Sequence, residues 1–315
     1  MIPAVSAATG GPTATFPYQW VAVGASGALS TSTSTTLASW TSRTSSFGSS
    51  TILAVASNGS SQYVAVGAAG KLATSPDGIT WTQQTSSFNA GDTIQTVAYG
   101  GGYWVAGGDN GKVAYSADGV TWTQKATGIG AALSVDQVAW GNGVWVVASS
   151  SSSQLFTATD PTGTWTSRTS NVNKVGDVLY FKGQSIWVAG SNTGSVGALV
   201  SSTDAITWTT RTSSININTS GGVRFAANNT VVAASCYDAS LSFDIQSSTN
   251  GTSWTNRTPA TSSGVMWNVG ASDDLGLMVL PPLQSSSDGI TWTNRTTPFS
   301  DVFGLCHSTG NPSNR

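Results

Sequence analysis

An eight-residue segment that ends in Trp-Thr recurs along this chain and restricts its fold more than any other feature. The pattern Ser-x-Asp-Gly-x-Thr-Trp-Thr occurs at residues 75–82, 116–123 and 286–293. Weaker copies surround four further tryptophans, namely Trp40, Trp165, Trp208 and Trp254. Successive tryptophans of this set are 38 to 46 residues apart. A period of about forty residues with strand-like content is typical of sheets arranged radially around an axis.

Each repeat contains four short strand-like runs. In the second unit these runs are residues 53–56, 63–67 and 71–74, and the tryptophan segment 80–83 follows. An Asp-Gly pair at Asp77-Gly78 separates the last two runs, which is a strong hairpin signal because glycine accepts positive φ. All fourteen acidic residues are aspartates, and the scarcity of good helix formers predicts very little helix. We expect an all-β, seven-bladed β-propeller of four-stranded antiparallel blades.

The two ends of the chain predict how the ring closes. Three strands precede Trp40, beginning with Trp20–Val23, but the innermost strand of this blade is missing. An unassigned strand-like run, Val302–His307, follows the last repeat. We therefore expect the C-terminal strand to complete the first blade. Residues 18–315 form one propeller domain in this interpretation, and residues 1–17 form an extended N-terminal arm. The arm is either a disordered tail or a segment that docks on another subunit.

Composition excludes several classes of protein. Charged residues make up only 8% of the chain and the net charge is −2, so we expect no nucleic-acid partner and no anionic membrane surface. No apolar run is long enough for a membrane-spanning helix, and the first twenty residues do not resemble a secretion signal. The two cysteines, Cys236 and Cys306, fall in distant blades and are predicted to be free thiols.

The repeated segment resembles the Asp-box of sialidase-like β-propellers, in which Ser-x-Asp-x-Gly-x-Thr-Trp joins the third and fourth strands of a blade. Here one residue is absent between Asp and Gly. The resemblance extends over nearly the whole chain from Gln19 and implies the fold, since this turn is a structural device. Sialidase activity requires three converging arginines and a Tyr–Glu nucleophile pair. This chain has no glutamate, and five of its seven arginines belong to outer strands.

Most polar residues of the repeat have a structural interpretation. The box aspartates are expected to cap turns rather than bind a metal, and the tryptophans to pack as buried wedges between blades. Six of the seven residues three positions after each tryptophan are basic. We expect them to protect the free edge of the outer strand, with a basic belt for an acidic polymer as the alternative. His307, the one histidine, cannot form a two-histidine metal site, so neither metal nor cofactor is predicted.

Candidate ligand-binding residues lie in the loops between the second and third strands and between consecutive blades. These loops share one face and vary most in length, and binding usually resides in variable loops on a rigid scaffold. The polar and aromatic candidates on this face are Asp109, Asn110, Arg224, Tyr237 and Asp238. The alternative is that these loops are simply solvated.

Three functional hypotheses follow. The first is a non-enzymatic structural or adhesion subunit of a larger assembly, such as a phage tail or capsid accessory protein in the virion. It rests on the absence of recognisable catalytic chemistry, the low charge, the arm, and a general similarity to Ser/Thr/Gly-rich propellers of phage virions. Its partners would be other subunits, with a cell-surface glycan also open. The second is a lectin-like carbohydrate binder, and the third is a glycan-cleaving enzyme, which the residue inventory disfavours.

Overall fold

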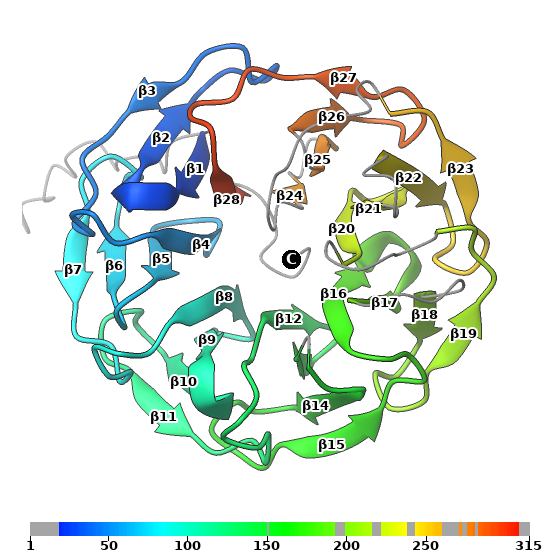
Figure 1. Cartoon of the computed structure of the whole chain (residues 1–315), viewed down its shortest axis with the longest axis horizontal. Helices are drawn as coiled ribbons and strands as arrows, with labels where there is room; N and C mark the ends of the chain where they lie inside the picture. Colours follow the sequence, from blue (N-terminus) through cyan, green and yellow to red (C-terminus); the bar gives the residue numbers. More distant parts are fainter. Residues whose placement is uncertain are drawn as a thin grey trace, which may run out of the picture.

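The computed structural model shows seven four-stranded antiparallel sheets arranged as blades around a central axis (Figure 1). It describes residues 19–149, 151–192, 199–215, 222–237, 243–259, 271–272, 276–280 and 283–308. The expected arm at residues 1–17 and the expected inner strand around 265–267 lie outside this description. Helical structure within the described ranges is confined to three 3-10 turns, η1 (Ala25–Gly27), η2 (Asp109–Gly111) and η3 (Lys182–Gln184).

Every blade repeats the same strand order from the axis to the rim. The innermost strands are β28 (Val302–His307), β4 (Ile52–Ser57), β8 (Ile94–Gly100), β12 (Gln137–Gly141), β16 (Val175–Phe181), β20 (Arg224–Ala227) and β24 (Ala271–Ser272). The second strands are β1 (Trp20–Gly24), β5 (Tyr63–Gly67), β9 (Tyr103–Gly108), β13 (Val144–Ala148), β17 (Ile186–Ser191), β21 (Val232–Tyr237) and β25 (Met278–Leu280). We number the blades 1 to 7 in this order.

The outer half of each blade contains two shorter strands. The third strands are β2 (Leu29–Ser32), β6 (Leu72–Ser75), β10 (Val113–Ser116), β14 (Gln154–Ala158), β18 (Leu199–Ser202), β22 (Phe243–Ser248) and β26 (Gln284–Ser286). The rim strands are β3 (Thr41–Ser42), β7 (Thr82–Gln84), β11 (Thr123–Lys125), β15 (Thr166–Thr169), β19 (Thr209–Arg211), β23 (Thr255–Arg257) and β27 (Thr293–Asn294). The rim strands pair on one side only.

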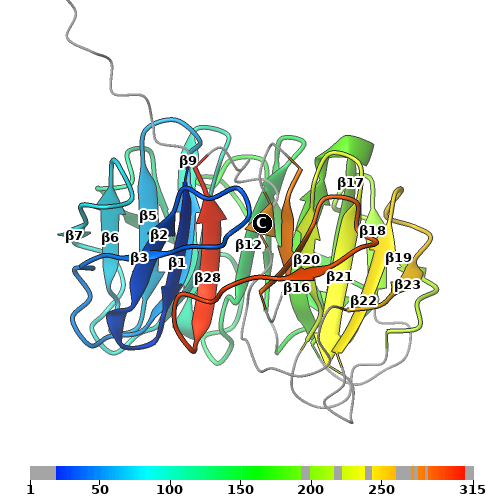
Figure 2. The same ribbon diagram turned by 90° about the horizontal axis from the view of Figure 1, so that it is seen from above.

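The C-terminal strand closes the ring, as the sequence predicted. Strand β28 pairs antiparallel with β1, so that Trp20 lies opposite His307 and Ala22 opposite Leu305. Figure 2 shows β28 in red standing beside β1 in blue, with the strands running along the axis of the ring. β28 also contacts β4 of blade 2 and β24 of blade 7. The two ends of the described chain therefore meet in blade 1 and join it to both neighbouring blades. Blade 1 therefore depends on residues almost 290 positions apart in the sequence.

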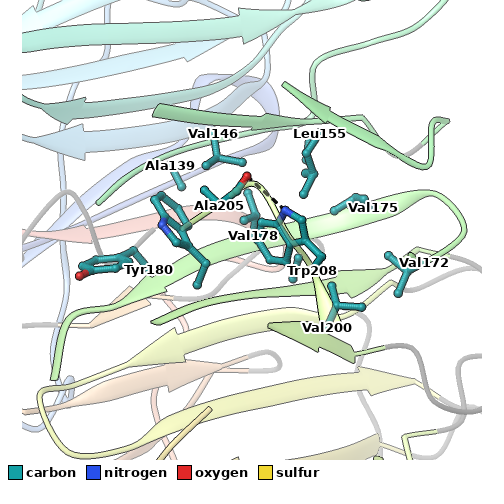
Figure 3. Packing of buried hydrophobic residues seen from close by; sticks show 13 residues of the cluster. Ala139, Val146, Leu155, Val172, Val175, Val178, Tyr180, Val200, Ala205 and Trp208 are labelled. Carbon is teal, nitrogen blue, oxygen red and sulfur yellow. Dashed lines mark hydrogen bonds between the residues drawn. The ribbon is translucent and has the colours of Figure 1, made fainter. Parts of the chain in front are cut away.

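The hydrophobic core is divided into seven clusters, each between two adjacent blades. The cluster between blades 4 and 5 is typical, because Val146 and Leu155 of blade 4 face Val178 and Trp208 of blade 5 (Figure 3). Consecutive apolar residues occur in the second strands because each of these strands is covered on both faces. The core thus lies between the blades rather than within any one of them.

The box tryptophans occupy these interfaces, as expected. Trp208 is 2% exposed, and its indole Nε1 donates a hydrogen bond to the carbonyl of Ala205 at 3.3 Å (Figure 3). Five of the seven are buried, whereas Trp40 and Trp254 are half-buried, so the prediction of seven fully buried wedges is wrong for these two. In blade 1 the Asp-Gly turn is missing, and the Trp40 indole instead donates to the carbonyl of Thr296 at 2.8 Å.

Candidate functional site

The turns between the third and fourth strands, which we call box turns, are built around a single carboxylate oxygen. In blade 3, Oδ1 of Asp118 accepts hydrogen bonds from the N–H groups of Val120 at 2.8 Å and Thr121 at 2.7 Å. The Ser116 hydroxyl donates to the same oxygen at 2.9 Å. The hydrogen bond from the Thr121 N–H is the main cause that lowers the pKa of Asp118 to about 2. The expectation that these aspartates cap turns is confirmed.

Blade 6 shows that the cap does not require a charge. Asn250 occupies the position of the aspartate there, and its Oδ1 accepts from the N–H groups of Thr252 and Ser253, both at 2.9 Å. The Ser248 hydroxyl donates to it at 3.0 Å. Asparagine and aspartate therefore form nearly the same turn. Among the described residues, no group of three or more potential metal ligands is present.

Six of the seven side chains three residues after the box tryptophans bond to the neighbouring strand of their own blade, and their predicted role of protecting the rim edge stays a prediction. In blade 4, Nε of Arg168 donates to the hydroxyl of Thr157 on the neighbouring strand at 3.1 Å. The same bond recurs for Arg43 with Thr31, Arg211 with Ser201, Arg257 with Ser247 and Arg295 with Ser285. Gln84 of blade 2 forms the equivalent bond to Thr74 at 2.9 Å. This repeated contact holds these six side chains along their own blades.

Two of the predicted ligand-binding residues tie loops together in blade 3. Asp109 lies in η2, and its Oδ2 accepts a hydrogen bond from the N–H of Thr93 at 2.8 Å. Asn110 adopts φ of 61° and donates from Nδ2 to Asp92 at 2.9 Å. Lys112 forms an ion pair with the same buried carboxylate. These contacts fasten the strand connection at 89–93 to the hairpin at 108–112.

The remaining candidates lie on the other side of the ring, in blade 6. Nη1 of Arg224 donates to the carbonyls of Gly176 at 3.2 Å and Val223 at 2.9 Å, which links blade 6 to blade 5. Tyr237 ends β21, and Asp238 lies outside the described residues. Blades 4 and 5 separate Arg224 and Tyr237 from Asp109 and Asn110. The structure therefore does not bring the four described candidates together into one site.

His307 and the two cysteines have structural surroundings. His307 is 1% exposed, its ring centroid lies 4.8 Å from that of Trp20, and burial lowers its pKa to about 4. In blades 3, 4 and 5 the same position is occupied by Tyr99, Trp140 and Tyr180, whose rings pack 4.9 to 5.1 Å from a tryptophan. Histidine is thus the aromatic residue of this position in blade 1. Cys236 and Cys306 are buried and are not joined in a disulfide, as predicted.

Two features of the face that carries the box turns, here called the box face, were not predicted. The exposed large apolar residues of the described chain, Ile79, Val120, Ile206 and Ile290, all occupy the position after Gly or Ala in the box turn, where they are 41% to 54% exposed. A groove of about 170 Å³ also opens there between blades 4 and 5. The sequence could have revealed the first feature, because in four box turns an Ile or Val stands between Gly or Ala and a Thr. The groove depends on contacts between blades and leaves no sequence signal.

Comparisons with known proteins support the fold. No protein-family model matches the chain, and no curated protein sequence matches it. Among solved structures, YCF48 bound to D1 peptide is 14% identical with a TM-score of 0.55, over 76% of this chain and 78% of that one. A protein from Desulfotomaculum acetoxidans is 10% identical with a TM-score of 0.64, over 92% of this chain and 98% of its own.

A glycoside hydrolase shares the same architecture. The GH74 xyloglucanase from Xanthomonas campestris is 14% identical with a TM-score of 0.57, and the match covers 93% of this chain and 56% of the enzyme. At these identities the likeness establishes the fold alone. The chain is therefore a seven-bladed, all-β propeller with Asp-box-like turns, similar in architecture to YCF48 and to GH74 propellers.

Proposed function

We propose that this chain is a non-enzymatic structural and adhesion subunit of a larger assembly, of the kind found as tail or capsid accessory proteins in phage virions. The observation that carries the proposal is the set of exposed apolar side chains on the box face, at equivalent positions of blades 2, 3, 5 and 7. We call these residues the apolar knobs: Ile79, Val120, Ile206 and Ile290. Apolar side chains repeated around one face of a rigid ring suit contact with a flat partner surface.

The box turn itself does not require an apolar residue at this position. Thr162 in blade 4 and Thr252 in blade 6 occupy it, and the N–H of each donates to the cap residue two positions earlier, at 2.8 Å to Asp160 and 2.9 Å to Asn250. The knobs contribute little to the internal packing, since roughly half of each side chain faces solvent. A contact with another subunit gives a physical reason for exposing them, because it would bury this surface.

Two further observations support binding rather than catalysis. The carboxylates of Asp118, Asp204 and Asp288 each accept two backbone hydrogen bonds in separate turns, so they serve the fold individually. YCF48, a propeller of similar fold, has been solved bound to a peptide, which shows that such a ring can recognise a protein segment. In the proposal, the partners are other subunits, the N-terminal arm at 1–17 is a second contact, and the site of action is the virion or an extracellular surface.

The test is whether the ring occurs in repeated copies in a particle, and whether the knobs hold it there. Particles purified from the organism that encodes the chain should show seven-bladed rings in symmetric positions by cryo-electron microscopy. A variant with Ile79→Thr, Val120→Thr and Ile290→Thr should fold normally and be lost from the particles. A matched control, Thr162→Ser with Thr252→Ser, should be retained. Absence of the ring from every purified particle would contradict the proposal.

A lectin-like function is the second candidate, and the groove between blades 4 and 5 favours it. A glycan array probed with the labelled chain tests this function directly. A glycan-cleaving enzyme remains the third and least supported candidate, although the GH74 xyloglucanase shares the fold. Prolonged incubation with xyloglucan and other polysaccharides, followed by chromatography of the products, should show unchanged substrates.

A further inference from the structure

The groove between blades 4 and 5 combines groups that are kept apart elsewhere in the molecule. Blade 4 contributes Val144 at the start of β13, Ala158, Arg168 and four threonines from β14, β15 and the box turn between them. Blade 5 contributes Asp204 and Ile206 from its box turn. The groove therefore contains one cation, one anion, several hydroxyls and three apolar side chains. Its volume of about 170 Å³ is below the roughly 300 Å³ at which pockets for drug-sized ligands begin.

Val144 occupies a position that faces the box turn of the next blade. Val144 precedes the residue of β13 that pairs with Trp140. The equivalent residues of blades 1 and 2 are Gln19 and Gln62, and each of them reaches the box turn of the next blade. The amide of Gln19 donates to the carbonyl of Asp77, and the amide of Gln62 lies against Gly119. Val144 instead packs beside Ala205 of the next box turn, and it leaves space at the interface that the longer glutamine side chain would occupy.

Both charges of the groove are held in place by the fold. Nε of Arg168 is anchored on the Thr157 hydroxyl at 3.1 Å. Oδ1 of Asp204 accepts from the N–H groups of Thr207 and Ile206, both at 2.8 Å. The hydrogen bond from Thr207 is the main cause that lowers the pKa of this carboxyl, so it stays ionised at neutral pH. Within the described ranges, Arg168 and Asp204 line the same groove without forming an ion pair.

We propose that this groove binds a single neutral sugar ring, a hexopyranose or its simple glycoside. A fixed guanidinium and a fixed carboxylate that do not touch favour a ligand whose groups both donate and accept hydrogen bonds, as sugar hydroxyls do. The threonines supply further hydroxyl partners. Val144 and Ile206 supply apolar surface for the C–H face of the ring. An amino acid could also bridge the two charges, but it would leave the threonine hydroxyls without ligand contacts.

This inference goes beyond the proposed function, because it concerns the isolated chain and holds whether or not the ring is part of a particle. The two ideas can fail separately. Ile206 is left unchanged in the variant that tests the apolar knobs, and no particle is needed to test the groove. A single ring in a shallow groove should bind with a dissociation constant of about 1 mM.

The experiment is a titration of the full ¹⁵N-labelled chain with methyl glycosides of glucose, galactose, mannose and N-acetylglucosamine, followed by NMR. One or more glycosides should shift the amide signals of residues in the groove. Val144→Gln places in blade 4 the residue found in blades 1 and 2, which should fill the groove and abolish these shifts. Arg168→Gln copies Gln84 of blade 2, so it should keep the bond to Thr157 while weakening binding at least about tenfold.

Arg211→Gln is the matched control, because it makes the same change one blade away and outside the groove. Its sugar affinity should equal that of the parent chain, and melting temperatures should show that all three variants are folded. The proposal is overturned if no glycoside shifts the groove signals, or if Val144→Gln binds as well as the parent. It is also overturned if glycine, a zwitterion added in parallel, shifts these signals and the glycosides do not.

Discussion

The inner wall of the ring, by which we mean the first and second strands of the blades, is stabilised by side-chain packing. The box turns are stabilised by local hydrogen bonds. At the inner wall, Trp104, Trp145 and Trp187 are at most 1% exposed, and each packs on an aromatic side chain of its own inner strand. Each also belongs to a hydrophobic cluster shared with the preceding blade. A box turn is held by hydrogen bonds among residues no more than five positions apart. The turn accepts Asp or Asn as its cap, and Ile, Val or Thr at its tip.

This difference indicates where the chain can vary at little cost. A change at the inner wall alters packing in a dense core, which proteins tolerate poorly. A change in a box turn alters one or two local hydrogen bonds. Both features that we connect with binding, the apolar knobs and the groove, lie at box turns. The inner wall supplies rigidity, and the turns supply a surface that can differ from blade to blade.

The largest effect is expected from Trp187→Ala at the inner wall. Trp187 is fully buried, and its ring lies 5.1 Å from that of Tyr180. Its truncation should lower the free energy of unfolding by about 3–5 kcal/mol. Trp40→Ala, at a half-buried box tryptophan, should lower the free energy of unfolding by clearly less. Urea denaturation of both variants tests this order, and equal losses would show that the turns are as critical as the wall.

Acid should weaken the inner wall before it affects the turns. Burial lowers the pKa of His307 from 6.5 to about 4, so the unfolded chain binds the proton more readily. The stabilisation from neutral His307 is complete above pH 6.5 and is lost as the pH falls towards 4, by about 3 kcal/mol in all. Asp118 contributes in a lower window, between 3.8 and about 2.

The variant His307→Phe should remove the loss of stability between pH 6.5 and 4. Phenylalanine suits the position, because Tyr99, Trp140 and Tyr180 occupy it in other blades. Measuring the free energy of unfolding against pH for the parent and the variant gives the comparison. Curves that run parallel across this window would mean that His307 does not titrate on unfolding as proposed.

Close packing between neighbouring inner strands is tested by Gly141→Ala. A Cβ at Gly141 would lie 2.1 Å from Cγ of Tyr180 in the next blade, so the ring would have to move. We expect a loss of about 1–3 kcal/mol. Gly91→Ala is the control, since a Cβ there meets no atom within 4 Å. Thermal melting should show a lower Tm for the first variant and an unchanged or slightly higher Tm for the second.

The sequence predicted the parts of this fold that repeat. The number of blades follows from the seven repeats of the tryptophan segment. The closing strand Val302–His307 follows from the innermost strand that the first repeat lacks. Contacts that differ between blades could not be predicted. The ion pair between Asp92 and Lys112 joins two loops, and the space beside Val144 depends on how the side chains of two blades meet. Such details depend on three-dimensional distances that no local pattern encodes.

Within the turns, the cap itself should have a modest effect. Asp118→Ala removes the acceptor of two backbone hydrogen bonds and should cost about 1 kcal/mol, because the freed N–H groups can turn to water. Asp118→Asn should cost less, since Asn250 caps the same turn in blade 6. Chemical denaturation measures both values. A loss for the asparagine variant as large as that for alanine would show that the charge, rather than the hydrogen-bond geometry, stabilises the turn.

The smallest effect is expected from Ala205→Gly in the box turn of blade 5. Ala205 adopts φ of 59°, where the other box turns with this pattern have glycine. Glycine would relieve about 1 kcal/mol of backbone strain. It would also remove a methyl group that is fully buried against Trp208 and its neighbours, which costs about as much. The two terms should nearly cancel, so Tm should change little. A clear rise in Tm would mean that the backbone strain at Ala205 destabilises the fold by more than the burial of its methyl group stabilises it.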